Sequence, residues 1–187
     1  VTQGWTVDTS SFTLNADLAD WAVATSKGVV LPTYPASRAF SKQFQGFAGA
    51  LSEPGVMLGE TLSASTYWHG ERLSQWANDW VQVYSNPKMN FMTSNMEDSG
   101  TLTALHRLAR IGRVDPERIM VLRTVSNYTQ PPPGASAVWS ATAEYPDSGL
   151  PALESAYRFG SAVVRAIVKN WSVYETTLPK HNASAEP

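Results

Sequence analysis

The sequence predicts an α/β fold, in which strands and helices alternate along the chain. Apolar runs of β-like composition alternate with amphipathic stretches such as residues 71–84 and 99–112. Clusters of polar and aromatic residues at 63–69, 95–98 and 126–128 come directly after runs predicted as strands. Because ligands of α/β folds bind beyond the carboxyl ends of the strands, these three clusters form the candidate functional site.

The first predicted helix covers residues 16–26. Leu18 and Trp21 recur there at helical spacing, Asn15 precedes them as an N-cap, and Gly28 follows as a stop. The sequence therefore predicts a short helix with one apolar face.

A short apolar run at residues 56–62 follows a Pro-Gly turn and predicts a strand. The amphipathic stretch at 71–84 predicts the next helix. Its apolar side chains fall on one face, which we expect to be buried: Leu73, Trp76, Trp80, Val81 and Tyr84.

A brief β-like run at residues 89–93 leads into a helix predicted over 99–112. The β-branched run at 119–125 predicts a buried strand. A long helix is predicted from about residue 151 to 174, and the tail at 180–187 is expected to fray. The buried face of the long helix is expected to contain Phe159, Val163, Ile167 and Trp171.

Composition limits the classes of function. The chain has 187 residues, of which 43% are apolar, and this length favours a single α/β unit over residues 1–187. A net charge of −2 with scattered basic residues gives no attraction to nucleic acid. No stretch approaches the roughly 18 to 20 apolar residues of a membrane-spanning helix. Three glycosylation sequons, at Asn127, Asn170 and Asn182, are a weak hint of secretion or a cell-surface location.

The common catalytic motifs are absent from the sequence. It contains no G-x-S-x-G elbow, Walker A loop, G-x-G-x-x-G or H-E-x-x-H, and it has no cysteine. His69, His106 and His181 lie far apart, and none has a second ligand at metal spacing. We therefore expect no metal site.

Met96 and Glu97 are the first candidates for ligand binding. A carboxylate between a strand and a helix can accept hydrogen bonds from two ribose hydroxyls, and a thioether offers an adaptable apolar surface to the sugar. The alternative is that Glu97 and Asp98 only cap the following helix, and the residues alone leave both interpretations open.

The other candidates are aromatic and amide side chains. The amide of Asn127 presents a donor and an acceptor side by side, as the O6/N7 edge of a purine requires, although it could also be a turn residue. Tyr67 and Trp68 could stack on a base or belong to the core.

Three stretches resemble the nucleoside phosphorylase superfamily, and more closely its fungal and bacterial branch of purine nucleoside permeases. They are SASTYWHG at 63–70, SNMEDSG at 94–100 and RTVSNY at 123–128. The resemblance implies a three-layer α/β/α fold with a mixed central sheet, of which this chain would form the carboxyl-terminal half.

The resemblance also implies roles for individual residues. Tyr67, or Trp68 if the register shifts by one, would stack on the purine. Met96 and Glu97 would hold the ribose. Ser126 and Asn127 would meet the base edge, where Asn127 would act catalytically by stabilising the leaving purine. An amide at this position suits 6-oxopurine nucleosides, because it cannot protonate N7 as a carboxylic acid can.

The implied reaction is phosphorolysis, with phosphate as co-substrate and no cofactor. Residues 1–60 contain nothing similar to the phosphate-binding loop of the superfamily, so we expect an amino-terminal half or partner chain to supply it. A homo-oligomer is expected as well. Two alternatives remain open: a non-catalytic nucleoside-binding protein that assists transport, and a storage or defence protein with a degenerate site.

Overall fold

The computed structural model describes residues 11–85 and 89–180 and shows a mixed α/β fold. Helices make up most of the regular structure. The elements in chain order are α1 (Ala16–Thr25), α2 (Pro35–Ser41), η1 (Lys42–Phe44), α3 (Ala48–Leu51), β1 (Glu60–Ser63), α4 (Glu71–Tyr84), β2 (Phe91–Asn95), α5 (Asp98–Arg110), η2 (Pro116–Arg118), α6 (Ala137–Thr142), η3 (Pro146–Gly149), α7 (Leu150–Lys169) and α8 (Trp171–Tyr174).

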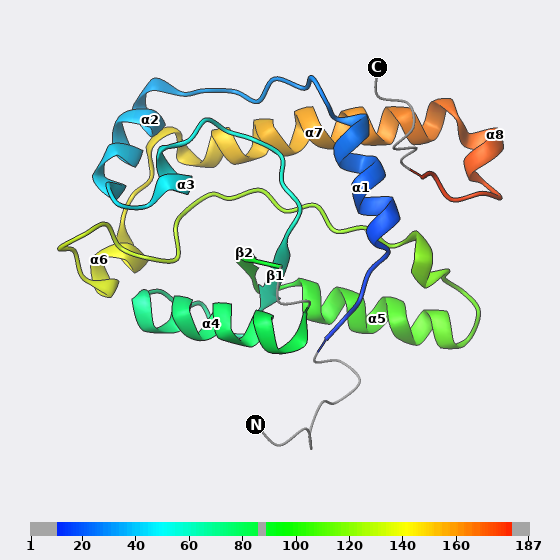
Figure 1. Cartoon of the computed structure of the whole chain (residues 1–187), viewed down its shortest axis with the longest axis horizontal. Coiled ribbons are helices and arrows are strands. Elements are labelled where there is room, and N and C mark those ends of the chain that lie inside the picture. Colours follow the sequence, from blue (N-terminus) through cyan, green and yellow to red (C-terminus); the bar gives the residue numbers. More distant parts are fainter. Residues whose placement is uncertain (1–10, 86–88, 181–187) are drawn as a thin grey trace.

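The small sheet lies in the middle of the molecule. Within the described ranges, β1 and β2 pair in parallel, with Ser63 opposite Asn95. In Figure 1 the strands lie between α4 and α5 on one side and α7 on the other. The α/β class is therefore confirmed, whereas the three-layer arrangement around a mixed sheet stays a prediction.

Several predicted elements are confirmed. The side chain of Asn15 accepts a hydrogen bond from the backbone N–H of Leu18 and so caps α1. Helix α4 covers the predicted residues, and α5 begins one residue before its predicted start. Gly112 follows α5 with a φ of 68°, the left-handed conformation common after a helix end.

The first core joins α1 to α7. Leu18, Trp21 and Ala22 pack against Phe159 and Val163. Trp21 also meets Tyr174 edge to face, with a distance of 5.6 Å between the ring centroids. The buried face predicted for the long helix is thus correct at Phe159 and Val163, but Trp171 is half exposed because the helix breaks at Asn170.

The run at 119–125 is not a strand, and that prediction was wrong. Ile119 is buried and Met120 packs against the first core, but the backbone joins no sheet. Arg123 lies in the middle of the run and forms ion pairs with Glu97 and Asp98. These ion pairs hold the segment near the amino end of α5, and Figure 1 shows it in yellow-green as an irregular connection.

The apolar stripe predicted for α4 is confirmed at Val81 but was wrong at Leu73, Trp76 and Trp80. Ser74, Ala77 and Val81 form the buried face of α4, whereas Leu73, Trp76 and Trp80 are exposed.

The bounds of the two strands differ from the predicted ranges. Strand β1 covers only the end of the predicted run at 56–62, and β2 lies two residues later than predicted. The tail at 180–187, which was expected to fray, lies outside the described residues except for Lys180.

An aromatic cluster forms a second core around Phe44. Its members come from α2, η1, α6 and two loops, and none of its helices was predicted. The centroid of the Phe44 ring lies 4.2 Å from that of Tyr128, the last residue of the third predicted site cluster. The cluster consists of Phe40, Phe44, Tyr128, Trp139 and Tyr145.

We expect Phe44→Ala to lower the free energy of unfolding by about 3–5 kcal/mol, because Phe44 is only 1% exposed and its removal leaves a cavity. Urea denaturation followed by circular dichroism measures the change. Phe47→Ala is the matched control, since Phe47 is 37% exposed and its loss should cost only about 1–2 kcal/mol. Equal losses in the two variants would contradict the central role of Phe44.

Candidate functional site

The parallel pairing of β1 and β2 brings their carboxyl ends to one edge of the sheet. The N–H of Ala64 donates to the carbonyl of Asn95 at 2.9 Å, which extends the pairing just beyond the strands. The clusters at 63–69 and 95–98 therefore start from the same edge. The segment containing Arg123 and Asn127 joins them through side-chain contacts.

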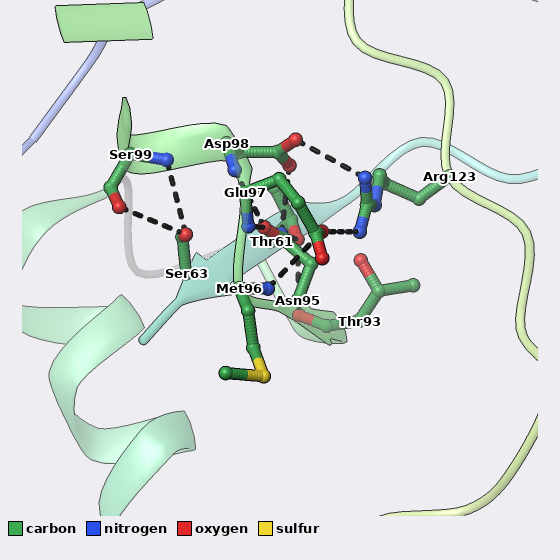
Figure 2. A network of polar contacts seen from close by, with 9 residues as sticks. All are labelled: Thr61, Ser63, Thr93, Asn95, Met96, Glu97, Asp98, Ser99 and Arg123. Carbon is green, nitrogen blue, oxygen red and sulfur yellow. Dashed lines mark hydrogen bonds and ion pairs between the residues drawn. The ribbon is translucent and has the colours of Figure 1, made fainter. Parts of the chain in front are cut away.

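The side chain of Asn95 organises the start of α5. Its Oδ1 accepts hydrogen bonds from the backbone N–H groups of Glu97, at 3.1 Å, and Asp98, at 2.9 Å. Its Nδ2 donates to Thr61 on β1 and to the buried carboxylate of Asp98. Figure 2 shows Asn95 at the centre of this network. One buried amide thus ties both strands to the helix.

Glu97 is not a side-chain cap of α5. It occupies the N-cap position but makes no side-chain capping hydrogen bond. The free N–H groups of the first turn are bound instead by Asn95 and by Ser63, whose Oγ accepts from the N–H of Ser99 at 3.0 Å. The capping role considered for the Glu97 side chain is therefore wrong.

The carboxylate of Glu97 is exposed and paired with Arg123. Nη2 of Arg123 lies 3.0 Å from Oε2 of Glu97, and Nη1 lies 3.3 Å from Oδ1 of Asp98. The N–H of Met96 also donates to Oε2 of Glu97, at 3.3 Å. The guanidinium of Arg123, helped by this backbone donor, lowers the pKa of Glu97. Glu97 is therefore ionised at neutral pH.

Tyr67 and Asn127 are brought together. Nδ2 of Asn127 donates to Oη of Tyr67 at 2.9 Å, which joins the first and third clusters. The ring of Tyr67 lies 4.6 Å from that of His69, and Nδ1 of His69 lies 3.0 Å from Oγ of the buried Ser140. Burial lowers the pKa of His69 and favours its neutral form.

The remaining predicted residues point in different directions. Trp68 stacks on Phe91 of β2, with 6.1 Å between the ring centroids, so it faces the sheet while Tyr67 is exposed. Met96 is exposed, and Figure 2 shows its side chain directed away from Arg123. Ser126 is exposed beside Asn127.

Sequence reasoning assigned no role to Arg123, Asn95 or His69. A charged residue inside the apolar run at 119–125 was the available signal for Arg123. For Asn95 the available signal was an amide shortly before a predicted helix, since three of its four contacts are with Glu97 and Asp98; only the contact with Thr61 on β1 is distant in sequence.

An open hollow of about 320 Å³ lies beside the site, between α4, β2 and the loop at 129–130. None of the six predicted binding residues lines it. Its lining is Ser74, Gln75, Asn78, Phe91, Met92, Thr129 and Gln130.

No group of three or more His, Asp or Glu side chains between residues 11 and 180, leaving aside 86–88, is arranged to hold a metal ion. Among the helices of these same ranges, none combines the length and apolar character that crossing a bilayer demands.

Residues 1–179 match a family model described as purine nucleoside permease (NUP). A purine nucleoside permease of Candida albicans is 30% identical over 170 residues, which are 90% of this chain and 42% of the relative. A probable purine nucleoside permease of Schizosaccharomyces pombe is 24% identical over 166 residues, 89% of this chain and 47% of the relative. The chain thus spans less than half of these relatives. No solved structure matches it.

We expect Asn95→Ala to lower the free energy of unfolding by about 2–3 kcal/mol, because it removes the cap of α5 and leaves the buried Asp98 without a donor. Urea denaturation measures this loss. Glu97→Gln is the control and should change stability much less, since its side chain does not cap the helix. A larger loss in Glu97→Gln would restore the capping interpretation.

The pKa of Glu97 should rise toward its ordinary value in Arg123→Gln, because the variant removes the main cause of the lowered pKa. NMR titration of the Glu97 side-chain carboxyl in both proteins measures this. A pKa lowered in the folded state stabilises the fold above the unfolded pKa, and this contribution is lost as the pH falls through the folded value. The part of the stability difference that comes from Glu97 should therefore shrink below about pH 4. Identical titration curves would exclude the ion pair in solution.

Proposed function

The chain belongs to the purine nucleoside permease family, and from this premise we propose that it binds a purine nucleoside at the carboxyl ends of β1 and β2. One observation carries the proposal. Asn95 and Ser63 bind the free N–H groups of α5, so the Glu97 carboxylate is exposed, ionised and available to accept hydrogen bonds from a ligand.

In this proposal Glu97 accepts hydrogen bonds from the ribose hydroxyls, and Met96 offers its thioether to the sugar. Tyr67 is exposed and can stack on the base, whereas Trp68 is turned toward Phe91 and is the weaker candidate. Ser126 and Asn127 meet the purine edge. The Asn127 amide would exchange its hydrogen bond with Tyr67 for one with the base.

Residues 123 and 127 of one short segment contact the two ends of the proposed site. Arg123 touches Glu97, and Asn127 touches Tyr67. Four residues of extended chain span at most about 13–14 Å, so the Cα atoms of Arg123 and Asn127, which contact the two ends of the proposed site, lie no farther apart than this. The proposal also retains the placement of the chain in the nucleoside phosphorylase superfamily, with its three-layer fold.

Phosphorolysis is the finer proposal and rests on Asn127. An amide at N7 and O6 would bind the developing charge of a leaving 6-oxopurine more strongly than the neutral ground state. Phosphate and the residues that bind it would come from an amino-terminal half or a partner chain. The competing proposal is binding without turnover, as part of nucleoside uptake.

Glu97→Gln should weaken inosine binding about tenfold or more, because a neutral amide replaces the charged acceptor of the ribose hydroxyls. Isothermal titration calorimetry of the wild-type chain and the variant measures this. Glu71→Gln is the matched control, since Glu71 is an exposed carboxylate in the first turn of another helix. Equal affinity in all three proteins would remove Glu97 from the site.

Release of hypoxanthine from inosine, with and without phosphate, separates the two proposals. Phosphate-dependent release supports phosphorolysis, and tight binding without release supports an uptake role. In the first case Asn127→Asp should shift preference toward adenosine, because a carboxylic acid can protonate N7, whereas Asn170→Asp should not. A degenerate site predicts no binding, and hence none of the roughly 2.7 kcal/mol of stabilisation that a ligand provides at 100 times its Kd.

A further inference from the structure

Helix α7 carries two separate apolar faces. Phe159 and Val163 form the inner face, which is buried against α1. The opposite side, here named the outer face of α7, contains four large apolar side chains that are between 58% and 68% exposed: Leu153, Tyr157, Val164 and Val168. A helix that is apolar on both sides is typical of one that is covered on both sides.

The outer face has the spacing of a helix-pairing seam. Leu150, Tyr157 and Val164 are separated by seven residues, and all three lie within α7. Leu153 lies between the first two. Apolar residues repeated about every 3.5 positions match the seam along which two helices pack.

We propose that two copies of this chain associate through the outer face of α7, with the two helices antiparallel. The apolar positions then meet in pairs, Tyr157 opposite Val164 and Leu153 opposite Val168. The two-fold axis passes near Gly160 and Ser161. Leu122 is 42% exposed and lies beside Gly160, so it extends the apolar surface at this centre.

Charge favours the antiparallel orientation. The exposed basic residues Arg165 and Lys169 lie in the carboxyl-terminal part of α7, whereas Glu154 and Arg158 form an ion pair near its start. Parallel helices would bring the basic ends of the two copies together. Antiparallel helices separate these charges and also oppose the helix dipoles favourably.

The exposed apolar area of α7 is large enough to form the apolar centre of a dimer interface. Helix α7 has 20 residues and is therefore about 30 Å long, and it runs along most of the molecule (Figure 1). Five large, half to two-thirds exposed side chains, those of the outer face together with Leu150, offer roughly 500 Å² at about 100 Å² each. A standard interface buries about 800 Å² per partner including its polar rim.

The test is the mass of the 187-residue chain in solution, measured by analytical ultracentrifugation over a range of concentrations. The wild-type mass should rise from 20.4 kDa to twice that value. Val164→Glu should remain monomeric. Val83→Glu is the matched control, because Val83 is 56% exposed on α4, and it should still dimerise. Circular dichroism checks that both variants are folded.

Single cysteines test the orientation, because the chain has none of its own. Ser161→Cys should cross-link to its own copy under mild oxidation, since it lies near the axis. Leu153→Cys should not, because antiparallel helices would separate the two copies of residue 153 by about 22 Å, whereas a disulfide needs Cα atoms within about 7 Å.

Three results would overturn the proposal. A wild-type chain that stays monomeric at all concentrations would mean that another polypeptide covers this face. A dimer abolished by Val83→Glu and not by Val164→Glu would place the interface on α4. Cross-linking through Leu153→Cys as readily as through Ser161→Cys would show parallel helices.

Discussion

The candidate site depends on the side chain of Asn95. One amide binds two backbone N–H groups at the start of α5, the hydroxyl of Thr61 on β1 and the carboxylate of Asp98. It is buried, so each of these bonds replaces one that water would otherwise make. Because Asn95 serves as the cap, Glu97 can turn its charge outward at the same turn. The ligand-binding role proposed for Glu97 requires that Asn95, and not Glu97, caps the helix.

Sequence periodicity predicted those features that depend on neighbouring residues. The capped helix α1, the long helices and the strand-to-helix junction at 95–98 each carry a local signal, such as Asn15 before an apolar repeat. The residues brought together at Tyr67 and Asn127 were proposed from motif resemblance. Their mutual hydrogen bond joins positions 60 residues apart, which no local pattern encodes.

The failures have a common physical cause. Periodicity shows that one face of a helix is apolar, but it does not identify what covers that face. Trp76 and Trp80 were therefore assigned to the core, although they stack on each other at the surface of α4. The run at 119–125 failed for a related reason. Its apolar composition suits a strand, but the ion pairs of Arg123 decide where the segment lies.

Arg123 connects the fold to the proposed function. An ion pair with the exposed Glu97 adds little stability, because water screens both groups. Asp98 differs, since its carboxylate is buried and needs compensating donors, which Asn95 and Arg123 provide. Arg123 therefore contributes to stability mainly through its ion pair with Asp98. The same guanidinium then orients the Glu97 carboxylate. A single guanidinium that holds the 119–128 segment against α5 thus sets the geometry between Glu97 and Asn127, the two ends of the proposed nucleoside site.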